Sequence, residues 1–175
     1  YSTYVDAFQA AAKQHATRTA VVDPEMGMKL SYSDLDAMSN QVAHFLLTKG
    51  VLASKESRVV LAMTRSWYYI VCYLGVLKAG GCFVPVDHEH IEAKMTHIIE
   101  DAEPVVLISH SLFRDKMLPF EGVEDGPEVI YFDKVVEDLA AFPKTSPAVS
   151  IAASNLAYII FTSGSTGKPK GVMLE

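Results

Sequence analysis

Residues 162–171, near the carboxyl end of the chain, form an unusual polar segment. They read Thr-Ser-Gly-Ser-Thr-Gly-Lys-Pro-Lys-Gly and contain no acidic side chain. Glycines let backbone N–H groups approach a ligand closely, while hydroxyls, amides and lysines can all donate to phosphate oxygens. Because each charge-assisted hydrogen bond contributes about 1.5–3 kcal/mol, several converging bonds would hold a polyphosphate. The candidate phosphate-binding residues are Thr162, Ser163, Gly164, Ser165, Thr166, Gly167, Lys168, Lys170 and Gly171.

A flexible linker and a Walker A loop are two other interpretations of this segment. A Gly/Ser linker has no reason to follow directly after an apolar run such as 156–161, which predicts a buried strand. A Walker A loop has four residues between its glycines, and its lysine precedes Ser or Thr. Here two residues separate Gly164 from Gly167, and Pro169 follows Lys168. The segment therefore favours a phosphate-binding loop of another type, placed after a strand as in many α/β proteins.

The preceding sequence supplies helices and strands that would position this loop. Strands that alternate with helices of ten or more residues predict right-handed βαβ units. The predicted fold class is thus α/β, a parallel β-sheet flanked by helices. Helical spacing of apolar residues covers 3–15, 33–50, 66–79 and 91–102, and short apolar runs predict strands at 20–22, 29–32, 58–63, 82–86, 105–108, 129–132 and 156–161.

Local signals make further predictions about turns and caps. The first two strands flank a turn-rich segment and predict a hairpin. Ser33, with Asp36 three residues later, predicts the N-terminal capping box of the second helix, and Gly50 predicts its end. The charged, turn-rich segment 115–127 predicts a surface loop. Residues 143–154 contain prolines and hydroxyl residues and predict a connector before the last strand.

The composition limits the class of protein. The chain has 175 residues, a formal net charge of −6 and a hydrophobic content of 50%, which together exclude disorder and disfavour nucleic-acid binding. The apolar-looking run 67–77 is much shorter than the roughly 20 residues of a membrane span. Two cysteines cannot form a disulfide framework or zinc site, so buried thiols in a reducing, cytoplasmic compartment are predicted. Tyr1 begins no signal peptide, which predicts that the sequence starts inside a larger gene product.

Three segments resemble one family. Residues 156–172, LAYIIFTSGSTGKPKGV, resemble the phosphate-loop signature of adenylate-forming enzymes, which include acyl-CoA ligases, luciferases and the adenylation domains of nonribosomal peptide synthetases. Residues 77–87, LKAGGCFVPVD, resemble a motif of those adenylation domains, and residues 30–35, LSYSDL, resemble an earlier one with Asp34 in place of Glu. The similarity runs from residue 8 to residue 174. The two earlier segments favour a scaffold role.

The resemblance implies a fold and an activity. The chain would be the amino-terminal portion of the large domain of an adenylate-forming enzyme, a partial adenylation domain over residues 1–175 with the rest beyond Glu175. The enzyme would activate an amino acid with ATP and Mg²⁺, release pyrophosphate and transfer the acyl group to the phosphopantetheine thiol of a peptidyl carrier protein. No catalytic residue or metal ligand is identified within residues 1–175, so this piece alone is predicted to be inactive.

The resemblance leaves two alternatives open. An acyl-CoA or aryl-acid ligase would share the loop but does not usually carry LKAGGCFVPVD. A non-catalytic remnant or interaction module would explain why residues 88–91, His-Glu-His-Ile, replace two prolines that the family commonly has there.

Several other side chains have chemical alternatives to a structural role. His88, His90 and Glu92 suggest a metal site, but His90 and His97 would be separated by about 10.5 Å of helix rise, too far for one ion. Asp87 is more readily a helix cap than a general base. The aromatic residues 67–69 have helical spacing, which favours core and rim positions over a ligand-stacking surface.

Overall fold

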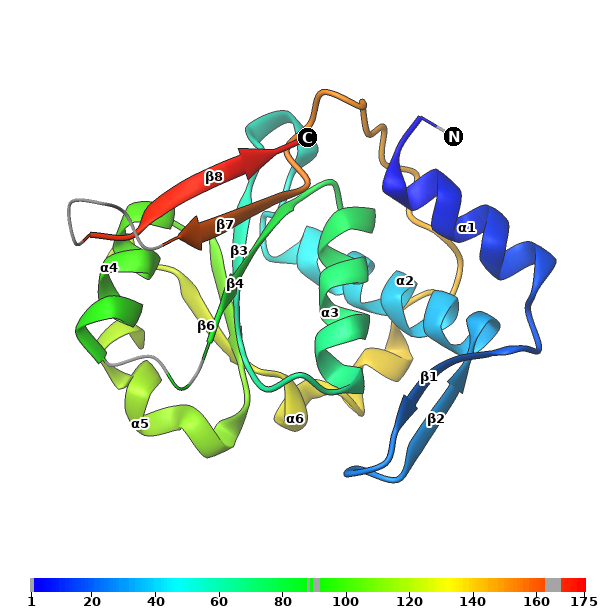
Figure 1. Ribbon diagram of the computed structural model, residues 1–175, viewed down its shortest axis with the longest axis horizontal. Coiled ribbons are helices and arrows are strands. Elements are labelled where there is room, and N and C mark those ends of the chain that lie inside the picture. Colours follow the sequence, from blue (N-terminus) through cyan, green and yellow to red (C-terminus); the bar gives the residue numbers. More distant parts are fainter. Residues whose placement is uncertain (1, 88, 90–91, 163–167) are drawn as a thin grey trace.

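The computed structural model describes residues 2–87, 89, 92–162 and 168–175, and within them the chain forms one large sheet with helices on both faces (Figure 1). The strands are β1 (Thr19–Asp23), β2 (Met28–Ser31), β3 (Arg58–Ala62), β4 (Cys82–Val86), β5 (Val106–Ser109), β6 (Glu128–Tyr131), β7 (Tyr158–Thr162) and β8 (Lys170–Leu174). The α-helices are α1 (Tyr4–Gln14), α2 (Tyr32–Thr48), α3 (Trp67–Lys78), α4 (Glu92–Ala102), α5 (Arg114–Met117) and α6 (Phe132–Val135). No helix in these described ranges is long and apolar enough to cross a membrane.

The large sheet has the strand order β6-β5-β3-β4-β7-β8. Its neighbouring strands are parallel except for β7 and β8, which form an antiparallel hairpin. Strands β1 and β2 form a separate antiparallel hairpin, as the sequence predicts. The predicted α/β class with a parallel sheet flanked by helices is therefore confirmed, with an antiparallel strand at one edge.

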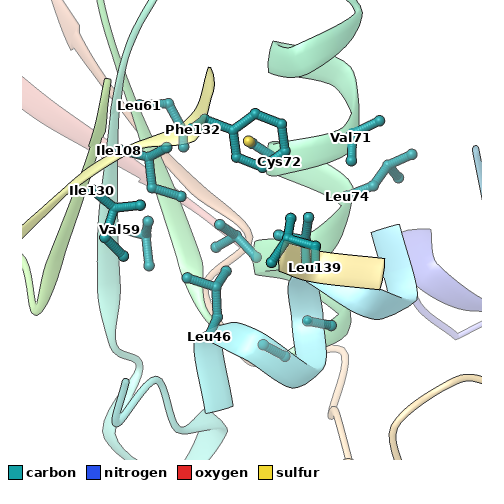
Figure 2. Packing of buried hydrophobic residues seen from close by; sticks show 14 of the residues in the cluster. Leu46, Val59, Leu61, Val71, Cys72, Leu74, Ile108, Ile130, Phe132 and Leu139 are labelled. Atoms are coloured by element: carbon teal, nitrogen blue, oxygen red, sulfur yellow. The ribbon is translucent and has the colours of Figure 1, made fainter. Parts of the chain in front are cut away.

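Alternate residues of the central strand β3 enter two different hydrophobic cores. Val59 and Leu61 belong to the core beneath α2 and α3, which also contains residues of β5 and α6 (Figure 2). Val60 and Ala62 belong to the core on the opposite face, where α4 packs. Side chains alternate between the two faces along a strand. A strand in a sheet that is covered on both faces therefore needs an apolar residue at every position, as β3 has from Val59 to Ala62. Burying one leucine or valine side chain contributes about 1.5–3 kcal/mol.

The capping box of α2 lies two residues earlier than Ser33 and Asp36 predict. Ser31 is the N-cap: its Oγ accepts from the Asp34 backbone N–H at 3.1 Å, and Asp34 Oδ2 accepts from the Ser31 N–H at 3.0 Å. The sequence contains two overlapping Ser-x-x-Asp patterns, and β2 ends at Ser31, so the helix begins immediately. Asp36 instead contacts Lys78 of α3, at 2.7 Å.

Two further sequence predictions need correction. The segment 115–127 is not only a surface loop, because it begins within α5 and continues as a 3₁₀ turn that buries Met117 and Phe120 in the α4-side core. Strand β8 has no counterpart among the predicted strands. By contrast, Cys72 and Cys82 are buried free thiols as predicted, and burial raises the pKa of Cys82 to about 12.

Candidate functional site

The phosphate-loop segment connects the two strands of the β7–β8 hairpin. Thr162, the last residue of β7, pairs with Lys170, the first residue of β8. The loop therefore leaves and re-enters the sheet at one point, at the free end of the hairpin (Figure 1). Residues 163–167, which include Ser163, Gly164, Ser165, Thr166 and Gly167, lie outside the described residues.

The described part of the segment presents its polar groups to solvent. Thr162, Lys168, Lys170 and Gly171 are exposed, and Pro169 is half-buried. The fixed backbone angle of Pro169 restrains the chain between the two lysines. The structure thus brings two cationic side chains and one hydroxyl to the base of the loop, where they could contact a bound anion.

The hairpin is joined to the main sheet over a short stretch. Strand β7 pairs with β4 at Phe83 and Tyr158, and the Phe83 backbone N–H donates to the Ala157 carbonyl at 3.1 Å. Ile159 points to the α4 side and is buried. Glu56 Oε1 accepts from the Leu156 N–H at 3.3 Å. The position of the loop therefore depends on how the chain enters β7.

An open groove of about 1070 Å³ adjoins Ile160 and Phe161 of β7. It lies at the carboxyl ends of β3 and β4, and its apolar lining includes Trp67, Pro85 and Phe161. Arg65 and Asp87 contribute charge to its lining. Open α/β sheets bind ligands at the carboxyl ends of their strands, so the groove is a candidate ligand site at this edge of the sheet.

The start of α3, which lines this groove, is capped by a residue from another element. Ser66 is the N-cap residue but makes no side-chain cap hydrogen bond. Asp23, at the end of β1, accepts instead from the Trp67 N–H through Oδ2 at 3.0 Å and from the Met26 N–H through Oδ1 at 3.0 Å. These backbone hydrogen bonds lower the pKa of Asp23.

The remaining candidate residues have structural roles. Asp87 Oδ1 accepts from the Glu89 N–H at 2.9 Å, a local turn contact five residues before α4 begins, so the predicted helix cap at Asp87 is not observed among the described residues. Trp67 is buried, while Tyr68 and Tyr69 are half-buried, in agreement with core and rim positions. No group of three or more His, Cys, Asp or Glu that could hold a metal ion exists among the described residues, and His88 and His90 fall outside them.

A serine, a histidine and an aspartate meet at the carboxyl ends of β5 and β6 but do not form a catalytic triad. Ser111 Oγ donates directly to Asp133 Oδ2 at 2.5 Å. His110 Nδ1 accepts from the Leu112 N–H at 3.2 Å and lies 3.6 Å from Asp133 Oδ1, so the histidine does not stand between the serine and the aspartate. A triad requires the histidine between the other two groups. The cluster instead joins the ends of neighbouring strands.

A buried lysine is the main polar feature that sequence reasoning overlooks. Lys78, within the LKAGG segment, is 2% exposed. Its Nζ donates to Asp36 Oδ1 at 2.7 Å, Ser39 Oγ at 2.8 Å and Asn40 Oδ1 at 2.7 Å. Its position in an otherwise apolar helix is the sequence signal that marks it. The contacts confirm that the LKAGG segment contributes to the scaffold.

Comparisons with known proteins agree with this combination of fold and loop. The AMP-binding enzyme family matches residues 8–175, and the chain belongs to this family, whose members are ATP-dependent adenylate-forming ligases. Bacitracin synthase 1 of Bacillus licheniformis is 39% identical over 168 residues, which are 96% of this chain and 3% of the relative. The chain therefore spans a small part of the curated relatives that it matches.

Two solved structures share the fold. A fatty acyl CoA synthetase of Mycobacterium tuberculosis superposes with a TM-score of 0.86 at 24% identity, covering 97% of this chain and 34% of that one. The nonribosomal peptide synthetase FmoA3, bound to α-methyl-L-serine-AMP, superposes with a TM-score of 0.80 at 24% identity, covering 97% and 18%. The fold is thus common to enzymes of both branches and does not separate them.

Proposed function

We propose that the chain is the amino-terminal part of an adenylation domain that activates an amino acid for nonribosomal peptide synthesis. The observation that carries the proposal is the phosphate-loop segment 162–171 at the free end of the β7–β8 hairpin, within a chain that matches the AMP-binding enzyme family over residues 8–175. The 39% identity to bacitracin synthase 1 supports the peptide synthetase branch.

In the proposed reaction, a carboxylate oxygen of the amino acid attacks the α-phosphorus of ATP. The acyl-adenylate forms and pyrophosphate leaves. The hydroxyls, backbone amides and lysines of the loop would hold the β- and γ-phosphates, so that their contacts strengthen as charge develops on the leaving group. Mg²⁺ would arrive as the ATP complex, since the described residues hold no metal-binding cluster of their own. The acyl group would then pass to the phosphopantetheine thiol of a peptidyl carrier protein.

The branch is tested by ATP–pyrophosphate exchange with the full-length gene product. We expect one or a few amino acids to stimulate exchange, and fatty or aryl acids not to do so. Exchange with a fatty or aryl acid alone, followed by transfer to free CoA, would establish the alternative of an acyl-CoA or aryl-acid ligase. If none of the acids stimulates exchange in a folded protein, the alternative of an interaction module would be favoured.

The buried free thiols Cys72 and Cys82 fit a reducing, cytoplasmic location.

The loop is tested by substitutions in the same assay. Gly164→Val and Gly167→Val should be more damaging than Ser165→Ala, because a β-branched side chain blocks close approach and positive φ. Loss of the one hydroxyl should cost about 1–3 kcal/mol. Lys168→Met and Lys170→Met should lower kcat with little change in KM for the amino acid, whereas Lys13→Met on the distant α1 serves as the control. Folded glycine variants with near-normal exchange would leave the flexible-linker interpretation standing.

A further inference from the structure

Lys78 is a cation enclosed by acceptors from helix α2. An ammonium has three N–H donors, and Nζ has acceptors on Asp36, Ser39 and Asn40 within 2.8 Å as well as the Asp36 carbonyl at 3.0 Å. Burial lowers the pKa of Lys78, and the nearby Asp36 carboxylate opposes that effect. A buried charge is costly unless it is paired and hydrogen-bonded, and Lys78 meets both conditions through α2.

Asn40 forms hydrogen bonds both with Lys78 and with the connector, residues 143–154. Its Oδ1 accepts from Lys78, and its Nδ2 donates to the Lys144 carbonyl at 2.7 Å. An ammonium can only donate, so Lys78 selects the amide orientation that turns Nδ2 toward the connector. Nδ2 also donates to Asp36 Oδ2 at 3.3 Å, and Asp36 is itself paired with Lys78. Without the ammonium, Asn40 Oδ1 and the Asp36 carboxylate would both lose their donor, and the side chain that holds the Lys144 carbonyl would be less restrained.

Helix α2 binds other carbonyls next to this one. Gln41 Nε2 donates to the Phe142 carbonyl at 3.2 Å, and His44 Nε2 lies 3.0 Å from the Thr145 carbonyl. The polar face of α2 therefore follows the backbone at the start of the connector. Among these three side chains of α2, Asn40 is the one that also accepts a hydrogen bond from the buried Lys78 ammonium, which orients its amide.

The connector leads into the β7–β8 hairpin. It runs along the side of α1 and α2 and then over the top of the molecule into β7 (Figure 1). Because β6 and β7 lie on opposite sides of β5, β3 and β4 in the sheet, the chain between them crosses the sheet through α6, the 3₁₀ turn Asp138–Ala141 and then the connector, which has no helix or strand of its own. At the far end the hairpin pairs with β4 at Phe83 and Tyr158.

We propose that Lys78 is a positioning residue that acts through Asn40 on the connector and thereby on the hairpin with the phosphate loop. Within the described residues, the interactions of Lys78 Nζ are with side chains and a carbonyl of α2 and with the Phe8 ring of α1. The Lys78 ammonium fixes the orientation of the Asn40 amide, and the amide holds the Lys144 carbonyl by a hydrogen bond. The connector, held in this way, keeps β7 in position to pair with β4. The anchoring is independent of the proposed enzymatic function, so it is tested without an activity assay.

Trypsin cleavage of the Lys144–Thr145 bond reports connector release in the full-length protein. Lys144 is exposed, but its carbonyl must leave Asn40 before a protease can bind the backbone. We expect Lys78→Met to accelerate this cleavage about tenfold, the effect of one lost hydrogen bond. Cleavage at Lys134–Val135 in α6 should not change, which distinguishes local release from global unfolding. Lys13→Met, an exposed lysine on α1, should behave as the unsubstituted protein.

Asn40→Asp distinguishes an effect through the hydrogen bond from Asn40 to Lys144 from a general packing effect of losing Lys78. The carboxylate keeps an acceptor for Lys78 but has no N–H for the Lys144 carbonyl, so the ion pair survives while the anchor is lost. We expect cleavage at Lys144–Thr145 as fast as in Lys78→Met, and no further increase in the double variant. Slow cleavage in folded Asn40→Asp would overturn the proposal, as would slow cleavage in folded Lys78→Met. If Lys78→Met does not fold, Asn40→Asp alone decides.

Hydrogen exchange measures whether release of the connector weakens the contact between the β7–β8 hairpin and β4. The Phe83 N–H donates to the Ala157 carbonyl and so reports contact between the hairpin and β4. We expect this amide to exchange faster in both variants, with unchanged amides in β3, which is paired on both sides. A released connector with normal Phe83 exchange would overturn the positioning role. In an active enzyme, the same variants should raise KM for ATP and leave KM for the acid unchanged.

Discussion

Gly171 lies where the phosphate-loop segment re-enters the sheet, and its lack of a side chain is used in packing. A Cβ at this position would lie 2.9 Å from Ile159 Cγ2 and 3.2 Å from Phe161 Cζ. Ile159 is buried and its branched side chain has little freedom to move. Gly171 therefore has a structural reason to be glycine, beside its proposed contact with phosphate.

We expect Gly171→Ala to lower the free energy of unfolding by about 1–3 kcal/mol, because the added methyl group forces Ile159 or the strand to shift. Denaturant unfolding of the full-length protein measures the change. Val172→Ala at the next, exposed position is the matched control and should cost less than about 1 kcal/mol. Normal stability in Gly171→Ala would show that the sheet accommodates the methyl group and that packing does not require glycine here.

Asp23 makes the stability of the chain sensitive to acid. Its pKa is lowered in the folded state because its carboxylate accepts the Trp67 and Met26 backbone N–H groups. A group with a lowered folded pKa contributes stability above its unfolded pKa, about 3.9, and loses that contribution as pH falls through the folded value. Asp23→Asn keeps only one acceptor oxygen.

We therefore expect Asp23→Asn to be less stable than the unsubstituted protein at pH 7. The difference should begin to shrink below about pH 4, where the unfolded aspartate starts to bind a proton, and should disappear as the pH falls through the lower folded pKa. Unfolding midpoints measured from pH 7 down to pH 3 check this, with the exposed neighbour Glu25→Gln as control. A difference that stays constant over the whole range would contradict an electrostatic cap.

Helices α2 and α3 approach closely because one of them carries a glycine at the crossing. A Cβ on Gly75 of α3 would lie 2.3 Å from Cγ1 and 2.6 Å from Cβ of Val42 in α2. Both residues lie in the core beneath these helices. The same close approach brings Lys78 of α3 within reach of Asp36 and Asn40.

We expect Gly75→Ala to destabilise the protein by about 1–3 kcal/mol or more, because the overlap is with a buried β-branched side chain. The double variant Gly75→Ala/Val42→Ala should recover part of this loss by making room for the new methyl group. Thermal unfolding of the two single variants and the double variant measures the coupling. Additive losses would mean that Val42 is not the obstacle.

Most elements could be predicted from the sequence, and the exceptions have physical causes. Helical spacing and apolar runs predicted α1, α3 and α4 and the strands β3–β6 within a few residues, since each is amphipathic or fully buried. The predicted start of α2 is two residues late because two Ser-x-x-Asp patterns overlap in the sequence. The structure uses the first, since β2 ends at Ser31 and Asp36 contacts Lys78. Strand β8 was missed because its first two residues are lysine and glycine and its side chains are exposed.

The candidate site was predictable only in its local part. Ten consecutive residues carry the phosphate-loop signal, so no knowledge of the fold is needed to find it. The anchoring of the connector joins residues far apart in the chain, Lys78 with Asn40 and Asn40 with Lys144. The first contact follows from packing of α2 on α3 and the second from packing of the connector on α2, and no local pattern of side chains encodes either.

The molecule as a whole consists of a well-covered sheet and a less covered hairpin at its edge. Strands β3, β4 and β5 are packed on both faces, whereas β8 is the terminal strand of the sheet within the described residues. On one face of the hairpin, Ile160 and its pairing partner Val172 are 43% and 48% exposed. An apolar edge strand with unpaired backbone groups is a surface that favours association with another chain.

The 175-residue chain by itself should therefore associate with itself through β8. Sedimentation velocity at increasing concentration should show species heavier than the 19.2 kDa monomer. Val172→Lys should shift the population toward monomer, because a charge on an edge strand opposes pairing of two such edges. Leu112→Lys, at a residue that is 80% exposed outside the hairpin, should leave the association unchanged. A chain that sediments as a monomer at every concentration would show that the β8 edge does not pair, whatever its exposed apolar area.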